Sequence, residues 1–378
     1  MSEWKTYKWG DLISLEYGKP IPDKNLLDGQ YPVYGTNGRI GTSNLTPLCK
    51  HPSIIVGRKG AYRGVHYSNK PFSVIDTAFF IEPKTSILDL KWAYYKLLTV
   101  DINKMDSGSA IPSTDRYEIY SLSVELPPLE EQQRIAGILG SLDDKIELNR
   151  RINANLEAQA QALFQSWFVD FEPFRDGPFV DSQLGKIPQG WKVEALSNLA
   201  TVIKKGITPS NAETYSHYSI PAYDDAHFPE KQSGETIKSG KYIVYNNSIL
   251  LSKLNPRIKR LWFIKTAEEN AICSTEFIPI QTKDTELISF VFYLIDSDIF
   301  YQQALSLVNG ATGSHQRFHA EDIMQIPFAW NKDAAIDFAQ KANYILQKIE
   351  DNIRENQTLS ALRDTMLPKL MAGEINVE

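Results

Sequence analysis

Two segments of this 378-residue chain each carry an apolar repeat long enough for a helix of about 40 residues. In the first segment no proline occurs between Pro128 and Pro173, and apolar or amide side chains recur at alternating steps of four and three residues. These positions are Ile135, Leu139, Leu142, Ile146, Asn149, Asn153, Leu156, Ala160, Leu163 and Trp167. This heptad pattern predicts a helix on the order of 60 Å long, whose apolar stripe must be covered by a second helix.

The second stripe lies in the same chain. It comprises Phe338, Ala342, Ile345, Ile349, Asn352, Asn356, Leu359 and Met366. Nearly the same nine letters, KIELNRRIN from Lys145 and KIEDNIREN from Lys348, occur within both stripes. We therefore expect an antiparallel coiled coil in which Asn149, Asn153, Asn352 and Asn356 face one another and fix the register. The alternative is that these asparagines face solvent and that the similarity only records a duplication.

The duplication extends beyond the helices. EWKTYKWGDL from Glu3 is echoed by GWKVEALSNL from Gly190, and SIIVGRKG from Ser53 resembles SILLSKLN from Ser248. A period near 200 residues is too long for a solenoid, so we interpret the chain as a duplicated pair of domains. The expected segments are a globular domain (1–127), a long helix (128–172), a linker (173–189), a second globular domain (190–328) and a second long helix (329–378).

Each globular segment mixes short β-like runs with amphipathic helical stretches, punctuated by Gly, Pro and Asn. This pattern predicts a mixed α/β (α+β) fold for both domains. The fold class expected for the whole chain is therefore two tandem α+β domains separated by two long antiparallel helices.

Composition narrows the class of protein. With 42% hydrophobic and 23% charged residues the chain is typical of a soluble globular protein. No run approaches the roughly 18 apolar residues of a membrane span, so we expect a cytoplasmic protein without membrane contact. The two cysteines, Cys49 and Cys273, lie one in each half without CxxC spacing. They predict neither a disulfide framework nor a zinc site, and we interpret both as small buried residues.

The net charge of −6 is unevenly distributed. Residues 129–172 contain eight acidic against four basic residues, and residues 329–378 contain eight acidic against six basic residues. The rest of the chain is balanced, with its basic residues grouped in loops, so the total charge does not exclude a nucleic-acid partner.

Basic and polar side chains gather at corresponding loops of the two globular segments. In the first, YGTNGRIG (34–41), GRKGAYRG (57–64) and SGSAIPS (107–113) supply Thr36, Asn37, Arg39, Arg58, Lys59, Tyr62, Arg63 and Ser109. In the second, SKLNPRIKRLWFIK (252–265) and NGATGSHQRF (309–318) supply Lys253, Asn255, Arg257, Lys259, Arg260, Thr312, His315, Gln316 and Arg317. Lys and Arg neutralise phosphates, and glycine lets the backbone approach them. One such loop alone favours a solvated turn, but their recurrence in both repeats favours DNA contact.

No familiar catalytic motif accompanies these loops. The sequence contains no GxxxxGK[ST] phosphate loop, no HExxH, and no Asn-Pro-Pro-aromatic or Asp-Pro-Pro-Tyr tetrapeptide. His315 and His319 are four residues apart, but we interpret the pair as incidental, so no metal site is predicted. Two other function classes stay open: a nuclease or methyltransferase with undetected motifs, and a coiled-coil scaffold without DNA affinity.

Over its whole length the chain resembles the specificity subunits of Type I restriction-modification systems. The most specific matches are LPPLEEQQRIAGILGSLDDKIELNRRINANLEAQAQALFQSWFVDF (126–171) and LRDTMLPKLMAGEINV (362–377). One departure is IPFAWNKDAA (326–335), which replaces the Pro-Pro-Leu-Glu-Glu-Gln start of the first helix and makes the start of the second helix less secure.

The resemblance implies a non-catalytic subunit that recognises double-stranded DNA. Each globular domain would be a target-recognition domain that reads half of a bipartite, asymmetric site. The helices would set the spacing and dock two methyltransferase subunits, through which restriction and translocase subunits would join. The resemblance implies no cofactor for this chain, since S-adenosylmethionine, ATP and magnesium would belong to the partners.

Overall fold

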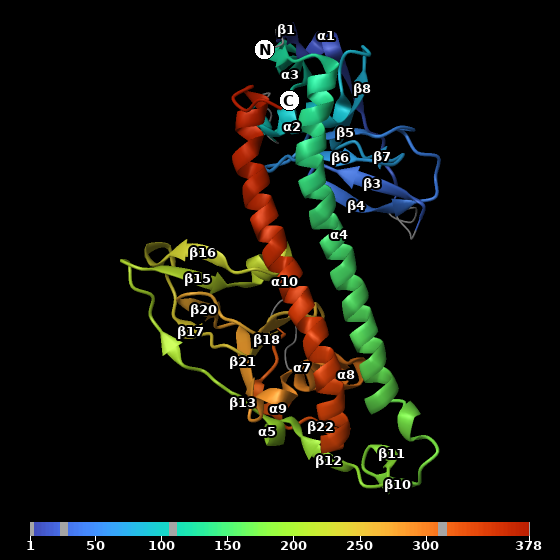
Figure 1. The fold of residues 1–378 in the computed structure, drawn as a ribbon, viewed down its shortest axis with the longest axis vertical. Coiled ribbons are helices and arrows are strands. Elements are labelled where there is room, and N and C mark those ends of the chain that lie inside the picture. The colour runs from blue at the N-terminus through green and yellow to red at the C-terminus, as the bar shows by residue number, and fades with distance from the viewer. Residues whose placement is uncertain (1–3, 23–28, 106–111, 309–315, 378) are drawn as a thin grey trace. The chain divides into compact units, whose positions relative to one another are not determined.

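The computed structural model describes residues 4–22, 29–105, 112–308 and 316–377. The chain forms two compact units: unit 1 comprises residues 1–145 and 359–378, and unit 2 comprises residues 146–358. Both units mix helices and strands (Figure 1), which confirms the predicted mixed α/β class.

Unit 1 is built around a four-stranded antiparallel sheet in the order β2-β8-β5-β6. A three-stranded sheet in the order β4-β3-β7 accompanies it. The strands are β2 (Ile13–Tyr17), β3 (Tyr31–Gly35), β4 (Gly38–Ser43), β5 (Ser53–Gly57), β6 (Val65–Ser68), β7 (Ser73–Val74) and β8 (Ala78–Pro83). Every residue of β5 is buried, as expected for an apolar run at the centre of a sheet.

Unit 2 repeats the four-stranded antiparallel sheet, now in the order β13-β21-β18-β19. Its second sheet is larger, with five strands in the order β14-β17-β20-β15-β16. The strands are β13 (Ala200–Val202), β14 (Gly206–Ile207), β15 (Thr214–Tyr218), β16 (Glu230–Ser233), β17 (Lys241–Ile243), β18 (Ser248–Ser252), β19 (Leu261–Ile264), β20 (Ala271–Ser274) and β21 (Phe277–Thr282).

The helices and outer strands follow the same repeat. In unit 1, β1 (Lys5–Lys8) pairs with β9 (Ser123–Leu126), and the short helices are α1 (Trp9–Leu12), α2 (Leu90–Leu98) and α3 (Arg116–Ser121). In unit 2, β12 (Lys192–Ala195) pairs with β22 (Pro327–Trp330), and the corresponding helices are α5 (Leu196–Leu199), α7 (Ile288–Asp296) and α9 (Ala320–Met324). Unit 2 also contains α6 (Ile220–Ala226), α8 (Asp298–Ser306) and the hairpin of β10 (Phe179–Ser182) and β11 (Gly185–Pro188). The duplication read from the sequence is therefore a duplication of one fold.

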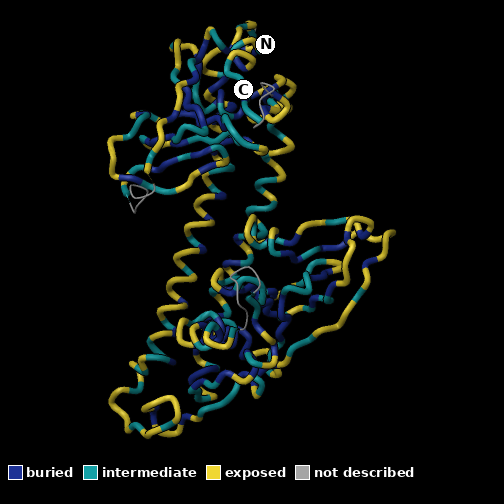
Figure 2. The backbone as a smooth tube through the Cα atoms, turned by 180° about the vertical axis from the view of Figure 1, so that it is seen from behind, coloured by how far each residue is buried: buried dark blue, intermediate teal, exposed yellow. Residues whose placement is uncertain are grey.

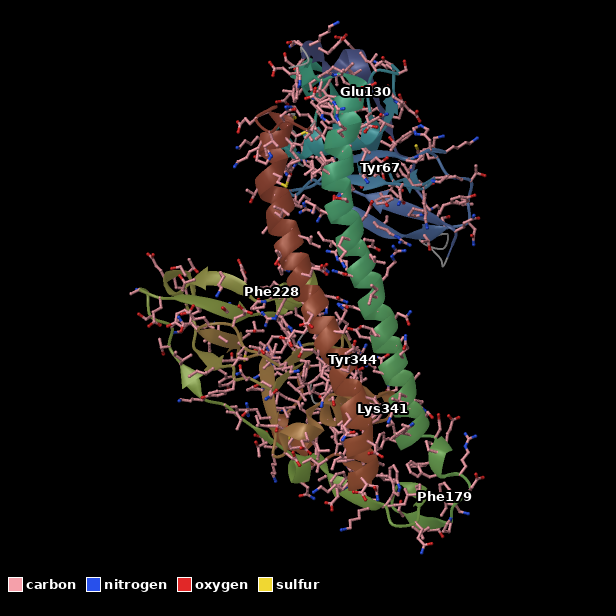
Figure 3. All side chains as sticks on the ribbon, viewed as in Figure 1. Tyr67, Glu130, Phe179, Phe228, Lys341 and Tyr344 are labelled. Carbon is pink, nitrogen blue, oxygen red and sulfur yellow. The ribbon has the colours of Figure 1, made fainter. Side chains whose placement is uncertain are left out.

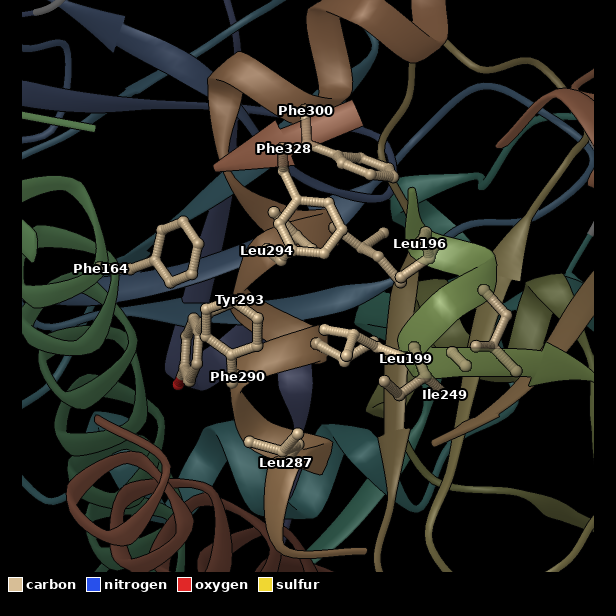
Figure 4. Packing of buried hydrophobic residues seen from close by; sticks show 14 of the residues in the cluster. Phe164, Leu196, Leu199, Ile249, Leu287, Phe290, Tyr293, Leu294, Phe300 and Phe328 are labelled. Atoms are coloured by element: carbon tan, nitrogen blue, oxygen red, sulfur yellow. The ribbon is translucent and has the colours of Figure 1, made fainter. Parts of the chain in front are cut away.

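The central strands and the inner helix faces form the cores, which are the dark segments in Figure 2. In unit 2 the core includes aromatic side chains from a long helix and from α7, shown at close range in Figure 4. The ring centroids of Phe164 and Phe290 lie 5.8 Å apart, and Phe164 also meets Phe338 edge-on at 5.5 Å. Such contacts fix the long helices to the domain they accompany.

The two long helices are confirmed as α4 (Leu129–Phe168) and α10 (Lys332–Met371). None of the heptad positions named above is exposed. Within unit 2, Asn352 donates to Asn153 at 2.7 Å and Asn149 donates to Asn356 at 3.0 Å, so the helices run antiparallel there. Asn149, Asn153 and Asn352 are buried, which contradicts the alternative that the asparagines face solvent.

The helix ends have local causes. The carbonyl of Pro128 accepts from the amide of Gln132 at 3.0 Å, so the prolines stop β9 and start α4. The divergent start of α10 is replaced by an Asn cap, because the Asn331 side chain accepts from the amide of Ala334 at 3.1 Å. The first helix ends four residues before the predicted boundary at residue 172, since Phe171 adopts a left-handed conformation (φ 53°) ahead of Pro173.

Cys49 and Cys273 are buried and free, as predicted. Among the residues that the structure describes, no helix is both long and apolar enough to cross a membrane.

Candidate nucleic-acid interface

Two of the predicted loops of unit 1 are joined by direct hydrogen bonds. The loop that follows β5 is closed where the Gly57 amide donates to the Gly64 carbonyl at 2.7 Å. The Gly64 amide in turn donates to the carbonyl of Thr36, in the turn between β3 and β4, at 3.0 Å. The Thr36 hydroxyl lies 2.5 Å from the Lys59 carbonyl oxygen and 2.6 Å from that of Thr77, and its single proton can be donated to either. Thr36 therefore acts through its hydrogen bonds to hold the loops together.

A third segment joins the same loops. The Gly60 amide donates to the Pro112 carbonyl at 3.0 Å, and Lys59 and Ser113 form an isolated antiparallel bridge. The Thr114 amide donates to the Arg58 carbonyl at 2.8 Å. Three loops separated by up to about 70 residues in sequence thus form one surface in unit 1. Ser109, which we also predicted here, lies outside the described residues.

The predicted side chains of this surface differ in their availability. Asn37, Arg39 and Tyr62 are exposed, with Tyr62 at 67%. Arg58 lies over the Tyr17 ring, 4.8 Å from its centroid, and donates to the Asp76 carbonyl at 3.0 Å. The Lys59 ammonium lies 3.8 Å from the Asp76 carboxylate, a loose pair between half-exposed groups that contributes little stability.

Arg63 is not on this surface. Its side chain is 2% exposed, and the two protons of Nη2 are shared among the carbonyls of Ile102 (3.2 Å), Asn103 (2.9 Å) and Met105 (3.1 Å). Asn103 completes the contact by exchanging hydrogen bonds with the Arg63 backbone, at 2.8 and 3.1 Å. Our expectation that Arg63 contacts phosphate is therefore corrected, because a buried guanidinium that binds three carbonyls clamps one loop to another.

Sequence reasoning missed Arg116, although it lies just beyond the predicted Gly-Ser-rich loop. Its guanidinium carbon lies 5.2 Å from the centroid of Tyr17, the same ring that Arg58 covers, and 4.9 Å from that of Tyr117. The sequence could have pointed to Arg116, because a cation is followed directly by an aromatic residue at Arg116-Tyr117.

In unit 2 the equivalent loop follows β18. The backbone N–H of Asn255 donates to the backbone carbonyl of Gln316 at 3.3 Å, and the backbone N–H of Phe318 donates to the backbone carbonyl of Lys253 at 3.1 Å. Leu254 and Arg317 form an isolated antiparallel bridge, the counterpart of the bridge in unit 1. Asn255 has a left-handed backbone (φ 48°), which asparagine tolerates better than most residues. The structure thus brings the predicted loop residues together, except that Thr312 and His315 lie outside the described residues.

Three cations of the unit 2 loops form ion pairs with carboxylates. Arg260 binds Asp224 through two hydrogen bonds at 2.6 and 2.8 Å, and this contact lowers the pKa of the Asp224 carboxyl. Lys259 lies 2.8 Å from the Asp296 carboxylate and also donates to its backbone carbonyl at 2.6 Å. Arg317 pairs with Glu276 at 3.1 Å. These partners reduce the positive charge that the three residues can offer to phosphate.

Two other cations of the same loop remain available. Within the described part of the chain, neither Lys253 nor Arg257 has an ion-pair partner, and Arg257 is exposed. Exposed cations without partners are the groups that release counterions when a nucleic acid binds. Arg257, together with the half-buried Lys253 of the same loop, is therefore the strongest phosphate-binding candidate of unit 2.

The outer surface of α10 in unit 2 exposes a different kind of side chain. Tyr344, labelled in Figure 3, is 75% exposed, and the nearby Lys341 ammonium lies 5.1 Å from the centroid of the Trp167 ring of α4. An exposed aromatic residue beside a cation is typical of a protein-binding surface.

Comparison with known proteins agrees with this geometry. Residues 1–158 match the family model described as Type I restriction modification DNA specificity domain. A Type I restriction enzyme specificity subunit of Methanocaldococcus jannaschii is 27% identical over 79% of this chain and 72% of its own length. The HindI specificity subunit of Haemophilus influenzae is 27% identical over 99% of this chain and all of its own length. Over nearly its whole length the chain is similar to the specificity subunits of Type I restriction-modification systems.

A solved structure supports the fold. The specificity subunit from M. genitalium superposes with a TM-score of 0.59 at 16% identity, covering 98% of this chain and 96% of the other. The matched relatives are named as specificity subunits of Type I restriction enzymes, which agrees with our expectation of a DNA-recognition subunit.

Proposed function

We propose that this specificity subunit recognises a bipartite, asymmetric DNA site, with unit 1 reading one half and unit 2 the other. The observation that carries the proposal is the repeated loop surface beside the repeated sheet. In each unit, the loop after the central strand of the sheet is bridged to a distant segment and presents polar or basic side chains. Phosphate contacts position such a surface, and side chains that reach base edges specify the sequence.

We assign a role to each loop side chain from its exposure and from whether another group of the protein already pairs with it. In unit 1, Arg39, Arg58 and Lys59 supply charge, while Asn37 and Tyr62 are exposed groups able to reach bases. In unit 2, Lys253 and Arg257 supply charge, and Asn255 and Gln316 offer amides. Asparagine and glutamine amides pair with adenine through two hydrogen bonds, which makes them the base-reading candidates.

The two long helices serve the complex in this proposal. Since α4 and α10 both contain residues of unit 1 and of unit 2, we propose that their length sets the spacing between the half-sites. Each heptad corresponds to about 10 Å of helix, or roughly three base pairs. Their acidic outer faces, together with Tyr344, would dock two methyltransferase subunits, through which restriction subunits join.

A domain exchange tests the proposal. Residues 1–126 are replaced by the matching segment of a relative, the complex is expressed, and the methylated sequence of the host DNA is read. We expect one half of the methylated site to change while the other half and the spacing stay the same. The reciprocal exchange of residues 190–328 is the control and should change only the other half. A change in both halves from either single exchange would show that the units do not read independently.

The other two function classes have distinct signatures. The purified chain would modify or cleave DNA with magnesium and S-adenosylmethionine if it were itself an enzyme. A scaffold without DNA affinity would show no DNA binding that responds to salt concentration or to DNA sequence. A specificity subunit should show neither behaviour.

A further inference from the structure

A side-chain cluster in unit 1 lies outside the loop surface. Cys49, His51 and Glu82 each offer one ligand-type atom, and these atoms lie within 4.8 Å of one another. The Cys49 Sγ is 3.8 Å from the His51 Nε2, which is 2.8 Å from the Glu82 Oε2. This cluster is not visible in the sequence, because Glu82 comes from β8 and is separated from the Cys-x-His pair by about 30 residues.

The backbone holds these residues firmly. Cys49 is fully buried and exchanges two hydrogen bonds of 2.9 Å with the backbone of Phe72. Glu82 belongs to β8, which pairs with both β2 and β5. His51 precedes β5, at the end of that strand opposite the loop 57–64. Rigid elements of this kind are what a metal site requires of its supporting structure.

The orientation of His51 is a second observation. Its Nδ1 lies 2.9 Å from the Pro52 carbonyl, so this nitrogen carries a proton and donates it. In a neutral imidazole the remaining nitrogen, Nε2, then presents a lone pair, which faces an acceptor in Glu82 and a sulfur in Cys49. The contact between the His51 Nε2 and the Glu82 carboxylate is stabilised either by a second proton on the imidazole ring or by a cation bound between Cys49, His51 and Glu82. A metal-binding histidine commonly donates its other N–H to a backbone carbonyl in this way.

We propose that Cys49, His51 and Glu82 form a binding site for a thiophilic divalent metal ion of the Zn²⁺ class. A thiolate, an imidazole and a carboxylate are all ligands that zinc accepts, and water would complete the coordination. On binding, the thiol loses its proton to solvent, and the ion takes the place of any proton on Nε2. The thiolate and the carboxylate together then balance the charge of the ion.

Movement of the His51 and Glu82 side chains would let the three groups hold such an ion, since their ligand atoms already lie within 4.8 Å of one another. With metal–ligand bonds of about 2.0–2.3 Å, tetrahedral ligand atoms lie roughly 3.3–3.6 Å apart. The Sγ–Nε2 separation of 3.8 Å is close to this range, while the Nε2–Oε2 separation of 2.8 Å must open by about 0.5 Å. The Glu82 and His51 side chains are 41% and 40% exposed, so they can move and a hydrated ion can reach them.

The bound ion would tie the segment before β5 to β8. It would therefore stabilise unit 1 without touching the loop surface that we assign to DNA. A ligand that binds only the folded state raises the melting temperature as its concentration rises above its Kd.

Metal titration of the full chain tests the proposal. Protein treated with a chelator and then dialysed is titrated with Co²⁺ as a spectroscopic probe and with Zn²⁺, and bound metal is counted by mass spectrometry. We expect one equivalent of metal, a thiolate-to-cobalt charge-transfer band, and a melting temperature several degrees higher with excess zinc.

Matched variants locate the site. His51→Gln and Glu82→Gln change partly exposed side chains and should weaken binding by about 10- to 100-fold or more, since even outer partners of a metal site contribute that much. Cys49→Ser should abolish the charge-transfer band, whereas Cys273→Ser, at the other buried cysteine, should leave the band and the stoichiometry unchanged. Failure of the unaltered protein to take up one equivalent, or uptake that persists in both His51→Gln and Glu82→Gln, overturns the proposal.

Discussion

In unit 1 the loop after the central strand is held by Arg63, which binds three backbone carbonyls, whereas in unit 2 the equivalent loop is held by Lys259 and Arg260, which bind carboxylates. Arg63 reaches the segment that follows α2, and Lys259 reaches Asp296 at the end of α7, the counterpart of α2. Both units therefore use a loop cation to fix the loop to the same element of the repeated fold. The cations of the loop surfaces therefore divide into those that hold a loop in place and those that stay exposed.

The two units also differ where the long helices meet. In unit 1 the helices are joined by an ion pair, with Arg363 Nη1 donating to Asp143 at 2.8 Å, and Asp143 also accepts from the Tyr95 hydroxyl at 2.6 Å. In unit 2 the helices are joined by the amides of Asn153 and Asn352. Neutral amides pair only with suitably placed partners, so we assign register control to the part of the helix pair in unit 2.

The largest effect should follow from breaking the clamp of unit 1. We expect Arg63→Ala to lower the free energy of unfolding by about 3 kcal/mol, because it leaves buried carbonyls without donors and creates a cavity. Lys259→Ala should cost less, about 1 kcal/mol, since Gln161 still donates to Asp296. Urea denaturation gives the energies, and hydrogen exchange in residues 57–64 and 102–105 localises the loss in Arg63→Ala.

Arg39→Ala is the control for this experiment, because it removes an exposed arginine of the same surface. It should change stability by no more than about 0.5 kcal/mol. If the Arg63→Ala protein is as stable as the Arg39→Ala protein, the buried arginine does not hold the loop and the difference between the two units is wrong.

A smaller effect should follow from separating the amides of unit 2. Asn352→Leu alone leaves the Asn153 side-chain oxygen buried without its donor and should cost about 1–3 kcal/mol. The double variant Asn153→Leu/Asn352→Leu removes both partners and should regain most of that stability while losing a fixed register. Thermal melting measures the first effect, and cross-linking between the helices measures the second. If the double variant is as unstable as the single one, the two asparagine side chains have further hydrogen-bond partners whose loss also costs stability.

The smallest effect concerns the available cations. Lys253→Ala and Arg257→Ala should each reduce the slope of log K against log salt by about 0.9, the value for one phosphate contact, and should weaken binding to all DNA sequences alike. Arg260→Ala is the matched control in the same loop and should leave the slope nearly unchanged, because Asp224 already neutralises this arginine. Binding titrations of the assembled complex at several salt concentrations decide between the two classes. Equal slopes for all three variants would remove the distinction between holding and contacting cations.

Much of the fold could be predicted from the sequence because its signals are local. The heptad stripes predicted two long helices, since burial at steps of three and four residues depends only on helix geometry. The repeat predicted two similar domains, and the structure shows sheets with the same strand order. The five-stranded second sheet of unit 2 was not predicted, because strand order depends on contacts between distant segments.

The candidate site divides in the same way. The loops that carry cations, glycines and amides could be recognised from the sequence, because these residue types recur at equivalent places in the two repeats. The role of each cation depends on the folded structure, in which Arg63 is buried among carbonyls, Arg260 pairs with Asp224, and Arg257 is exposed. It also brought Glu82 to Cys49 and His51. Whether a charged side chain is paired, buried or exposed depends on groups that fold against it from distant parts of the chain. The spacing of residues in the sequence does not show which groups these are.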